Sequence, residues 1–210
     1  MLCLIFSDVH GNLPALEQVI KKEKDVEQYI NLGDVVNYGP WSNECVELIN
    51  SLNCLNLIGN HEEYFINGRC DVKNDIVQAF FIKNYSSFEK LELIRKYKSE
   101  ILFNDFLLTH NLSNKGYIFK DTNVTLKMNT IIGHSHQQYQ RFENKFNLIN
   151  PGSIGQNRQD ISYSNYIIWD TDKNKFFDKK IFLDPMNLIN ELIEREFPEI
   201  CVNYYKNKIK

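Results

Sequence analysis

The sequence predicts an α/β protein built around a parallel sheet, and two observations support this class. Three short apolar runs, at 2–6, 29–32 and 54–58, alternate with two segments of helical periodicity, at 13–20 and 42–52. Each apolar run stops at polar residues, which is typical of a strand buried on both faces. The resulting β-α-β-α-β order indicates parallel strands joined by helical crossovers.

Local signals place the first helix. Asn12 is suited to cap it, and Pro14 is tolerated within its first turn. Leu16, Val19 and Ile20 then recur at helical spacing until a charged run begins at residue 21. We therefore expect this helix to pack one apolar face against the sheet.

The rest of the chain predicts a helical region followed by short strands. Residues 71–98 should be mostly helical, because apolar positions recur among charged ones. Strands are expected at 101–103, 106–109, 130–132, 139–142, 146–149, 162–169 and 175–183. The last two strands should form an antiparallel hairpin across 170–174. Pro185 opens a C-terminal segment, 185–210, which we interpret as one more helix and, from residue 197, a basic and frayed tail.

Composition and charge restrict the function classes. The 210 residues favour one domain, 1–210, over two. There are 24 Lys and Arg against 27 Asp and Glu, so the net charge is −3 and no strongly basic face is available for a long nucleic acid. A hydrophobic content of 43% is enough for a sizeable core and excludes disorder for most of the length.

The cysteines and the N-terminus indicate a cytoplasmic protein. The cysteines are odd in number and scattered, and they form no C-x-x-C pair: Cys3, Cys45, Cys54, Cys70 and Cys201. Neither a disulfide framework nor a thiolate zinc site is expected. The first apolar run lacks a basic region before it, and no stretch approaches about 18 apolar residues, so we expect no membrane partner.

Metal-capable side chains gather where the predicted strands end. They are Asp8 and His10 after the first strand, Asp34 after the second, Asn60 and His61 after the third, His110 after 106–109, and His134 and His136 after 130–132. The carboxyl ends of parallel strands share one edge of a sheet, so these groups should converge. Because residues two apart point the same way in an extended segment, Asp8 with His10, and His134 with His136, should each act from one side.

All five histidines of the chain belong to this set. A single histidine is most often a hydrogen-bonded core or surface residue. Five of them, together with two carboxylates and an asparagine, form a mixed oxygen and nitrogen ligand set without thiolate, which suits borderline divalent ions. This number of ligands is too large for one ion and suits two ions that share a bridging group.

These motifs resemble those of a known superfamily. The ordered series Asp8-x-His10, Gly33-Asp34, Gly59-Asn60-His61-Glu62, His110 and Gly133-His134-x-His136 resembles the calcineurin-like metallophosphoesterases over roughly residues 1–160. Segments 34–40 and 150–156 look like those of the small prokaryotic phosphodiesterase branch. Protein Ser/Thr phosphatases carry Asp-Arg-Gly where this chain has Asn37-Tyr38-Gly39, which disfavours a protein-phosphatase specificity.

The resemblance implies a four-layer α-β-β-α sandwich of two mixed sheets flanked by helices, with a two-metal site. It assigns Asp8, His10 and His136 to one ion, Asn60, His110 and His134 to the other, and Asp34 to both as a bridge. His61 is implied to be catalytic without being a ligand, assisted by Asn60 and Asp34. Glu62 is either a surface carboxylate or a support behind the ligands. Manganese is the expected metal, with Fe, Zn, Co, Ni and Mg as alternatives.

The activity implied by the resemblance is hydrolysis of a small phosphodiester or phosphomonoester. A hydroxide bridging the two ions would attack phosphorus in line, and His61 would protonate the departing oxygen from an extended turn in which it points away from the ion of Asn60. Arg158 is a candidate contact for the phosphate, with a plain surface role as the alternative. Tyr38, Trp41 and Tyr64 are candidates for stacking on an aromatic substrate, with packing as the alternative.

Two other functions stay open from the sequence. One is a binding scaffold that keeps the fold without turnover, which the complete ligand set and His61 argue against. The other is a nuclease acting on short nucleic acids, which the acidic balance does not exclude. A homo-oligomer also stays open.

Overall fold

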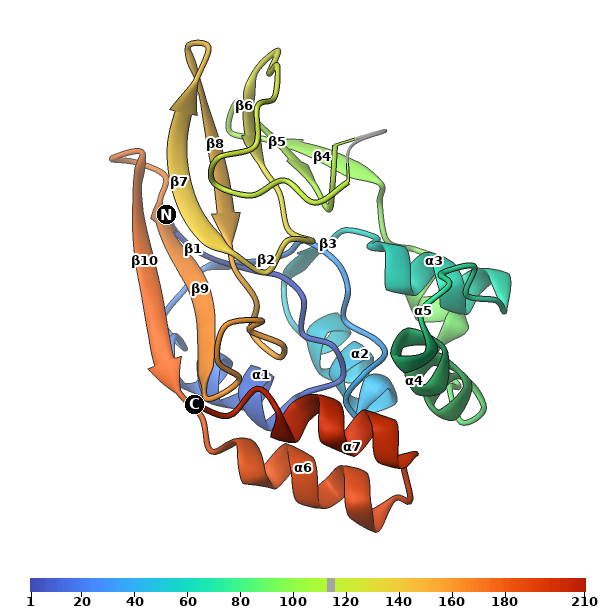
Figure 1. Cartoon of the computed structure of the whole chain (residues 1–210). Coiled ribbons are helices and arrows are strands. Elements are labelled where there is room, and N and C mark those ends of the chain that lie inside the picture. The colour runs from blue at the N-terminus through green and yellow to red at the C-terminus, as the bar shows by residue number, and fades with distance from the viewer. Residues whose placement is uncertain (113–115) are drawn as a thin grey trace.

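Two five-stranded mixed sheets form the centre of this computed structural model, which describes residues 1–112 and 116–210 (Figure 1). The first sheet contains β1 (Leu2–Phe6), β2 (Gln28–Asn31), β3 (Cys54–Asn56), β9 (Tyr163–Asp170) and β10 (Lys175–Phe182) in the order β10-β9-β1-β2-β3. The second contains β4 (Glu100–Phe103), β5 (Phe106–Thr109), β6 (Asn129–Ile131), β7 (Gln138–Glu143) and β8 (Phe146–Pro151) in the order β4-β5-β6-β8-β7.

Each sheet contains three parallel strands, to which antiparallel strands are added on one side in the first sheet and on both sides in the second. In the first sheet β1, β2 and β3 pair in parallel, as the β-α-β-α-β pattern predicts, and β9 adds antiparallel to β1. The expected hairpin is confirmed, because β9 and β10 pair along their full length. In the second sheet β5, β6 and β8 are parallel. The carboxyl ends of both parallel groups therefore point to one end of the sandwich.

Seven helices are formed by the described residues. They are α1 (Leu13–Lys22), α2 (Ser42–Ser51), α3 (Asn60–Asn67), α4 (Asp75–Tyr85), α5 (Leu91–Ile94), α6 (Pro185–Glu194) and α7 (Glu199–Lys206). The predicted cap of α1 is confirmed, since the Asn12 side chain accepts a hydrogen bond from the backbone N–H of Ala15. None of these helices combines the length and the apolar composition that a bilayer crossing demands.

The core between the two sheets consists of side chains from the inner faces of both. It includes Cys3, Ile5, Ile30, Leu32 and Leu57 from the first sheet and its loops, Ile167 and Trp169 from β9, and Phe106, Leu108, Ile131 and Ile149 from the second sheet. A second cluster packs the outer face of the first sheet against helices α1 and α2. A smaller one covers the second sheet with Ile118, Val124 and Leu126 from the segment after residue 116.

The structure corrects the expected loop after the third strand. Asn60 and His61 begin helix α3 rather than lying in an extended turn. Gly59 is the N-cap residue, and its backbone N–H donates to the side chain of Glu62, three residues later, at 2.8 Å. A carboxylate at this position satisfies one of the free donors of a helix start. The sequence contains this capping signal, but residues 60–67 include too few apolar side chains for a helical periodicity to be recognised.

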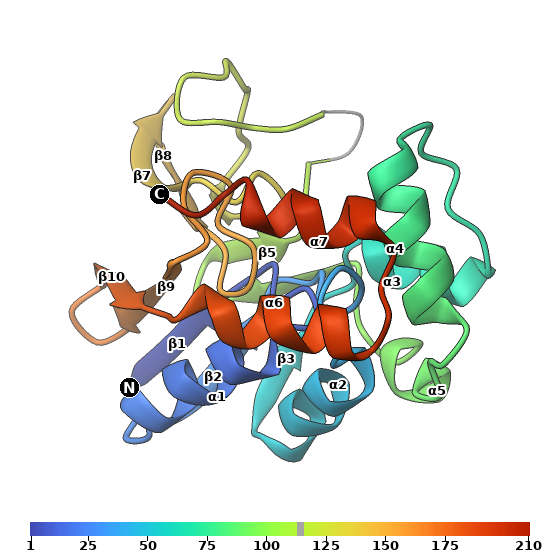
Figure 2. The ribbon, with the colours of Figure 1, turned by 60° about the horizontal axis from the view of Figure 1, so that its bottom comes forward.

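The C-terminal tail was predicted to fray and is instead a packed helix. Cys201 and Tyr205 are fully buried on α7, which packs against α6 and α4 (Figure 2). Together with Phe80 on α4 and Leu192 on α6 they form one apolar cluster. Of the basic residues that suggested a solvated tail, only Lys206 lies on α7, where it is exposed, and Lys208 and Lys210 follow the helix. The basic composition therefore did not reveal the apolar face that is buried.

A substitution on α7 tests whether this helix contributes to stability. Replacing Tyr205 with Ala should lower the free energy of unfolding by about 3 kcal/mol, because a fully buried aromatic ring is lost and leaves a cavity. Lys206→Ala, one residue on and exposed, is the control and should change stability by less than ~0.5 kcal/mol. Equal midpoints for both variants in urea unfolding would show that α7 is dispensable.

Candidate metal centre

Backbone hydrogen bonds hold the loops after β1, β2 and β8 together. The N–H of Asp8 donates to the carbonyl of Gly33 at 3.0 Å, and that of His10 to the carbonyl of Asp34 at 2.9 Å. From the other side, the N–H of Gly155 donates to the carbonyl of Asp8 at 3.1 Å. The loop carrying Asp8 is thereby fixed between the loops of the two sheets, which accounts for the convergence predicted from strand ends.

The alternation expected within these loops is wrong. Five of the predicted ligands have left-handed backbone conformations rather than extended ones: Asp8, His10, Asp34, His134 and His136 have φ between 47° and 65°. Non-glycine residues rarely adopt this region, at a cost on the order of 1 kcal/mol each, and such residues cluster at functional sites. Asp8 and His10 converge because the chain turns at each of them, whereas His134 and His136 belong to different groups of potential ligands.

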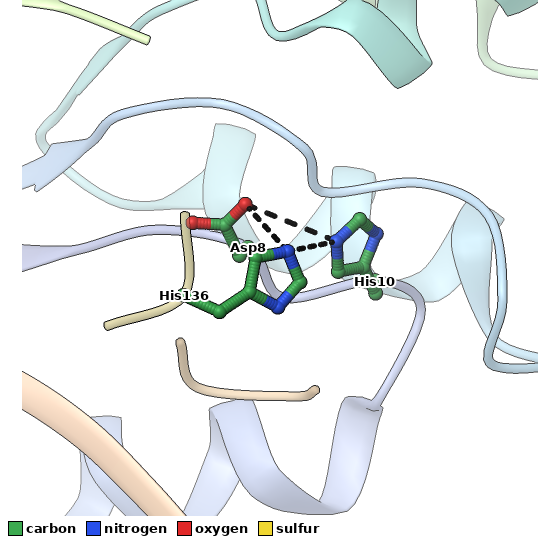
Figure 3. Close-up of side chains that lie close together, drawn as sticks. All are labelled: Asp8, His10 and His136. Carbon is green, nitrogen blue, oxygen red and sulfur yellow. Dashed lines mark hydrogen bonds and ion pairs between the residues drawn. The ribbon is translucent and has the colours of Figure 1, made fainter. Parts of the chain in front are cut away.

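Asp8, His10 and His136 form the first group of potential ligands (Figure 3). The Nε2 atom of His136 lies 3.2 Å from Asp8 Oδ1 and 3.3 Å from His10 Nε2, and His10 Nε2 lies 3.9 Å from Asp8 Oδ1. All three residues are buried. One small cation could contact all three atoms at once, in agreement with the predicted grouping.

Asp34, His110 and His134 form the second group. Asp34 Oδ2 lies 3.2 Å from His110 Nε2 and 4.0 Å from His10 Nε2, so this carboxylate faces both groups. The ring centroids of His110 and His134 are 5.2 Å apart. The position of Asp34 between the groups is the one required of the predicted bridge.

Three histidines are oriented by backbone carbonyls. The Nδ1 atoms of His10, His110 and His136 lie 3.3, 2.8 and 2.6 Å from the carbonyl oxygens of Val36, Leu32 and Gln156. A carbonyl only accepts, so each Nδ1 carries a proton, and the Nε2 atoms of His10 and His136, whose pKa values burial lowers, present lone pairs to the centre. This is the usual arrangement of metal-binding histidines, which donate their second nitrogen to a supporting group.

The donor set fits a divalent cation. Asp8 Oδ1, Asn60 Oδ1 and His110 Nε2 are buried and make no hydrogen bond to any described residue. Buried polar atoms without partners are rare and costly, and a bound cation would satisfy these three. Oxygen and imidazole donors without thiolate suit Mn, Fe, Zn or Co. The structure thus brings together all seven residues that sequence reasoning proposed as ligands.

The charge balance of the centre also favours a cation. Burial acts to raise the pKa of Asp34, but the neighbouring His110 and His61 hold it well below its usual value. Burial acts to lower the pKa of His110, and the Asp34 carboxylate outweighs it and raises this pKa to about 10. Burial lowers the pKa of His10 and His136, so these two imidazoles stay neutral. Either a proton on His110 Nε2 or a metal ion can lie between His110 and the Asp34 carboxylate and stabilise both.

Glu62 supports the bridge, which resolves the two interpretations of this residue. It is fully buried on α3 and accepts hydrogen bonds from four backbone N–H groups, those of Asp34, Val35, Val36 and Gly59, at 2.7–3.1 Å. Burial beside the Asp34 carboxylate raises the pKa of Glu62 to about 7, against the pull of these donors. Glu62 therefore ties the loop after β2 to the start of α3.

His61 and Asn37 form a pair beside the two groups. The side-chain N–H of Asn37 donates to His61 Nδ1 at 2.9 Å, while the Asn37 carbonyl accepts from Asn84 at 3.5 Å. The proton of the neutral His61 imidazole therefore lies on Nε2. The partner of the histidine is thus the amide of Asn37, the residue that stands where protein Ser/Thr phosphatases carry the Asp of Asp-Arg-Gly. His61 also lies close enough to His10 and Asp34 to share an ion with them.

A cavity of about 240 Å³ opens above the centre. His10, Asp34, Asn60, His61, His134 and His136 form its floor. Arg158 lines it as well, with its guanidinium 4.3 Å from the ring centroid of Tyr117, and Tyr117 stacks on His134 at 4.6 Å. Arg158 is therefore at the site and not on a plain surface. Tyr117 was missed, because nothing in its sequence surroundings marks it.

The three aromatic candidates differ in position. Tyr64 lines the cavity, and its ring makes an edge contact with His61 at 5.3 Å. Tyr38 also reaches the cavity but is 7% exposed and packs beneath His10 and His61. Trp41 packs against the apolar core and does not line the cavity, so its packing interpretation is correct.

Comparisons with known proteins agree with this geometry. The family model described as "Calcineurin-like phosphoesterase superfamily domain" matches residues 1–174. An uncharacterized protein of Methanocaldococcus jannaschii is 30% identical over 234 aligned positions, which cover 93% of each chain. The structure of a metallophosphoesterase from Sphaerobacter thermophilus has a TM-score of 0.83 at 24% identity, covering 100% of this chain and 99% of that one. A hypothetical protein from Pyrococcus horikoshii gives a TM-score of 0.81 at 15% identity and covers 97% of both chains. The two structures confirm the predicted fold class.

The support by Glu62 leads to a stability prediction. Glu62→Gln keeps one acceptor oxygen and turns an NH₂ group toward two backbone donors, so the free energy of unfolding should fall by about 3 kcal/mol. Glu63→Gln, the exposed neighbour on the same helix, is the control and should stay within ~0.5 kcal/mol. Urea unfolding of both variants is the measurement, and an unchanged Glu62→Gln midpoint would contradict the support.

Proposed function

Because the chain belongs to the calcineurin-like phosphoesterase superfamily, we propose that it hydrolyses small phosphate esters at a two-metal site. The observation that carries this proposal is the arrangement of Asp34 between two groups of buried, inward-facing ligand atoms. Asp8, His10 and His136 would hold one ion, and Asn60, His110 and His134 the other. We expect manganese to support activity, with Fe, Zn, Co, Ni and Mg as alternatives to compare.

The chain contributes several groups to the proposed reaction. When bound, two divalent ions would supply positive charge for the phosphate and lower the pKa of an attacking water toward neutrality. Arg158 would hold a phosphate oxygen from the cavity wall, and the Asn60 amide would face the same group. His61 in its imidazolium form would give the Nε2 proton to the departing oxygen and become the neutral imidazole. Asn37, whose side-chain nitrogen lies 2.9 Å from His61 Nδ1, fixes the ring.

The proposed substrates are small esters and not phosphoproteins. The cavity above the centre is about 240 Å³, and the Asn37-Tyr38-Gly39 segment departs from the protein-phosphatase pattern. Bis-p-nitrophenyl phosphate should therefore be hydrolysed with Mn²⁺, whereas a phosphoserine peptide should be a poor substrate.

Metal content tests the bridge. The protein reconstituted with Mn²⁺ should hold close to two ions. Asp34→Asn should lose metal from both positions and should lower activity by at least ~100-fold. This is a minimum, because even residues that only hydrogen-bond to a metal ligand contribute about 10–100-fold to metal affinity. Asp25→Asn, an exposed carboxylate in the turn after α1, is the control. The measurements are elemental analysis of the metal content and the rate of bis-p-nitrophenyl phosphate hydrolysis. Full occupancy and activity in Asp34→Asn would remove the bridge from the proposal.

A leaving-group series tests His61 and separates an enzyme from a scaffold. His61→Ala should keep both ions yet lose turnover by about 10²–10⁴. The loss should shrink for aryl esters whose leaving group is acidic enough to depart unprotonated. A ligand would behave differently, because its removal would lower metal content and slow all esters alike. Metal analysis beside rates over leaving groups of graded pKa distinguishes the two roles.

A further inference from the structure

Two cavities of opposite character meet at the metal centre. The first is the 240 Å³ cavity described above, here called the aromatic pocket, with walls formed by Tyr64, Val72, Val77, Tyr117 and Arg158. The second is a groove of about 660 Å³, here called the acidic groove, with walls that include Glu63, Ser99, Glu100 and Thr109. Asn60, Tyr64 and His134 line both. A phosphate held between them could extend one substituent into each.

The position of His61 assigns the departing alcohol to the aromatic pocket. His61 lines this pocket and is absent from the walls of the acidic groove. A proton from His61 Nε2 can therefore reach an oxygen whose substituent lies beside Tyr64 and Val77. Apolar and aromatic walls favour an apolar or planar group there. The other substituent of a diester, which stays on the phosphate, is left to the acidic groove.

The acidic groove has the wrong charge for a second anionic group. Glu63 and Glu100 are exposed carboxylates on its wall, and neither forms an ion pair with any described residue. Lys and Arg are absent from the part of the groove that the structure describes. The Thr109 hydroxyl on the groove wall is already engaged, because it lies 3.3 Å from the backbone carbonyl of Ser99 and 3.0 Å from that of Asn111, both of which only accept. The carboxylates would repel an anion and attract a cation.

The groove continues to the metal centre itself. His110 lines it, is only 5% exposed, and has an Nε2 atom without a hydrogen bond. The acidic wall and the proposed reaction site thus share one continuous space. Arg158, the cationic group at the site, lies on the opposite side in the aromatic pocket. Charge therefore differs from one side of the centre to the other, which would orient an asymmetric diester.

We propose that the substrate is a phosphodiester whose retained alcohol carries a cationic group that binds Glu63 and Glu100, and whose departing alcohol is aromatic or apolar. This inference rests on the phosphoesterase function proposed above. Water is the only co-reactant: the bond from phosphorus to the departing oxygen breaks, that oxygen takes a proton, and the water oxygen joins phosphorus. The products are the free alcohol and a phosphomonoester of the cationic alcohol.

Three esters with the same departing group test the proposal. p-Nitrophenyl phosphocholine has a cationic retained arm, ethyl p-nitrophenyl phosphate a neutral one, and 2-carboxyethyl p-nitrophenyl phosphate an anionic one. With the Mn²⁺-loaded protein, kcat/KM should fall in that order by about threefold to fivefold a step, the size expected for a solvent-exposed ion pair. The preference for the cationic ester should weaken as salt is raised from about 0.01 to about 0.5 M, because the Debye length shortens over this range and the charges are screened.

Substitutions identify the source of the preference. In the double variant Glu63→Gln, Glu100→Gln, the ratio of kcat/KM for the cationic ester to that for the anionic one should fall at least about fivefold. Glu17→Gln, an exposed carboxylate on α1, should leave the ratio at its original value. Thermal unfolding and metal content of each variant show that fold and centre are intact, and the two single substitutions give the same ratio test if the double variant is unstable.

The outcomes separate this inference from the function on which it rests. Hydrolysis of none of the three esters, and of neither bis-p-nitrophenyl phosphate nor p-nitrophenyl phosphate, with any of the metals would remove the phosphoesterase proposal. Hydrolysis at equal rates, or a preference for the anionic arm, would leave that proposal standing and overturn the assignment of the acidic groove. A cationic preference that persists unchanged in the double variant would overturn it as well, because the carboxylates would not be its source.

Discussion

Buried negative charge is the constraint on which the rest of this structure depends. Asp8 and Asp34 are almost completely buried, and no lysine of the described chain reaches them. A buried carboxylate costs several kcal/mol unless it is paired and hydrogen-bonded. The surrounding atoms act as partners for a cation: neutral histidines with lone pairs turned inward, and an asparagine oxygen without a hydrogen bond. The fold makes a cavity in which a divalent ion would have the lowest energy.

Contacts within the surrounding loops stabilise the candidate ligands in an unfavourable backbone conformation. Left-handed backbone at five predicted ligands is unfavourable, and it persists only where neighbouring contacts prescribe it. Glu62 supplies such contacts through four backbone N–H groups. Gly59 supplies space, because a Cβ atom there would collide with the Asp34 carboxylate. The loop after β2 and the start of α3 are thus one unit, and a change in either would move the bridge.

The sequence predicted where the candidate ligands meet, but it did not predict the backbone conformation that orients them or two of the short helices. Chemistry-bearing residues at strand ends were correctly expected to converge, because parallel strands must bring their carboxyl ends to one edge. The finer geometry was wrong where it assumed extended backbone, as at His10 and His136, since side-chain direction depends on φ values that no periodicity reports. Helix α3 and helix α7 were missed for a related reason. Both are short, and their burial comes from segments distant in the chain, such as Phe80 against Tyr205.

The amino-acid sequence alone was enough to predict the class of fold and the convergence of oxygen and imidazole side chains at one edge of the sheet, because these follow from strand order and residue chemistry; the roles of these residues and the bound metal stay predictions. Three features could come only from the folded chain. They are the Asn37 contact to His61, the placement of Arg158 on Tyr117, and the opposition of an aromatic pocket to an acidic groove. Each joins residues from separate elements through side-chain packing, and the distances between such residues depend on how the two sheets and their loops fit together in space.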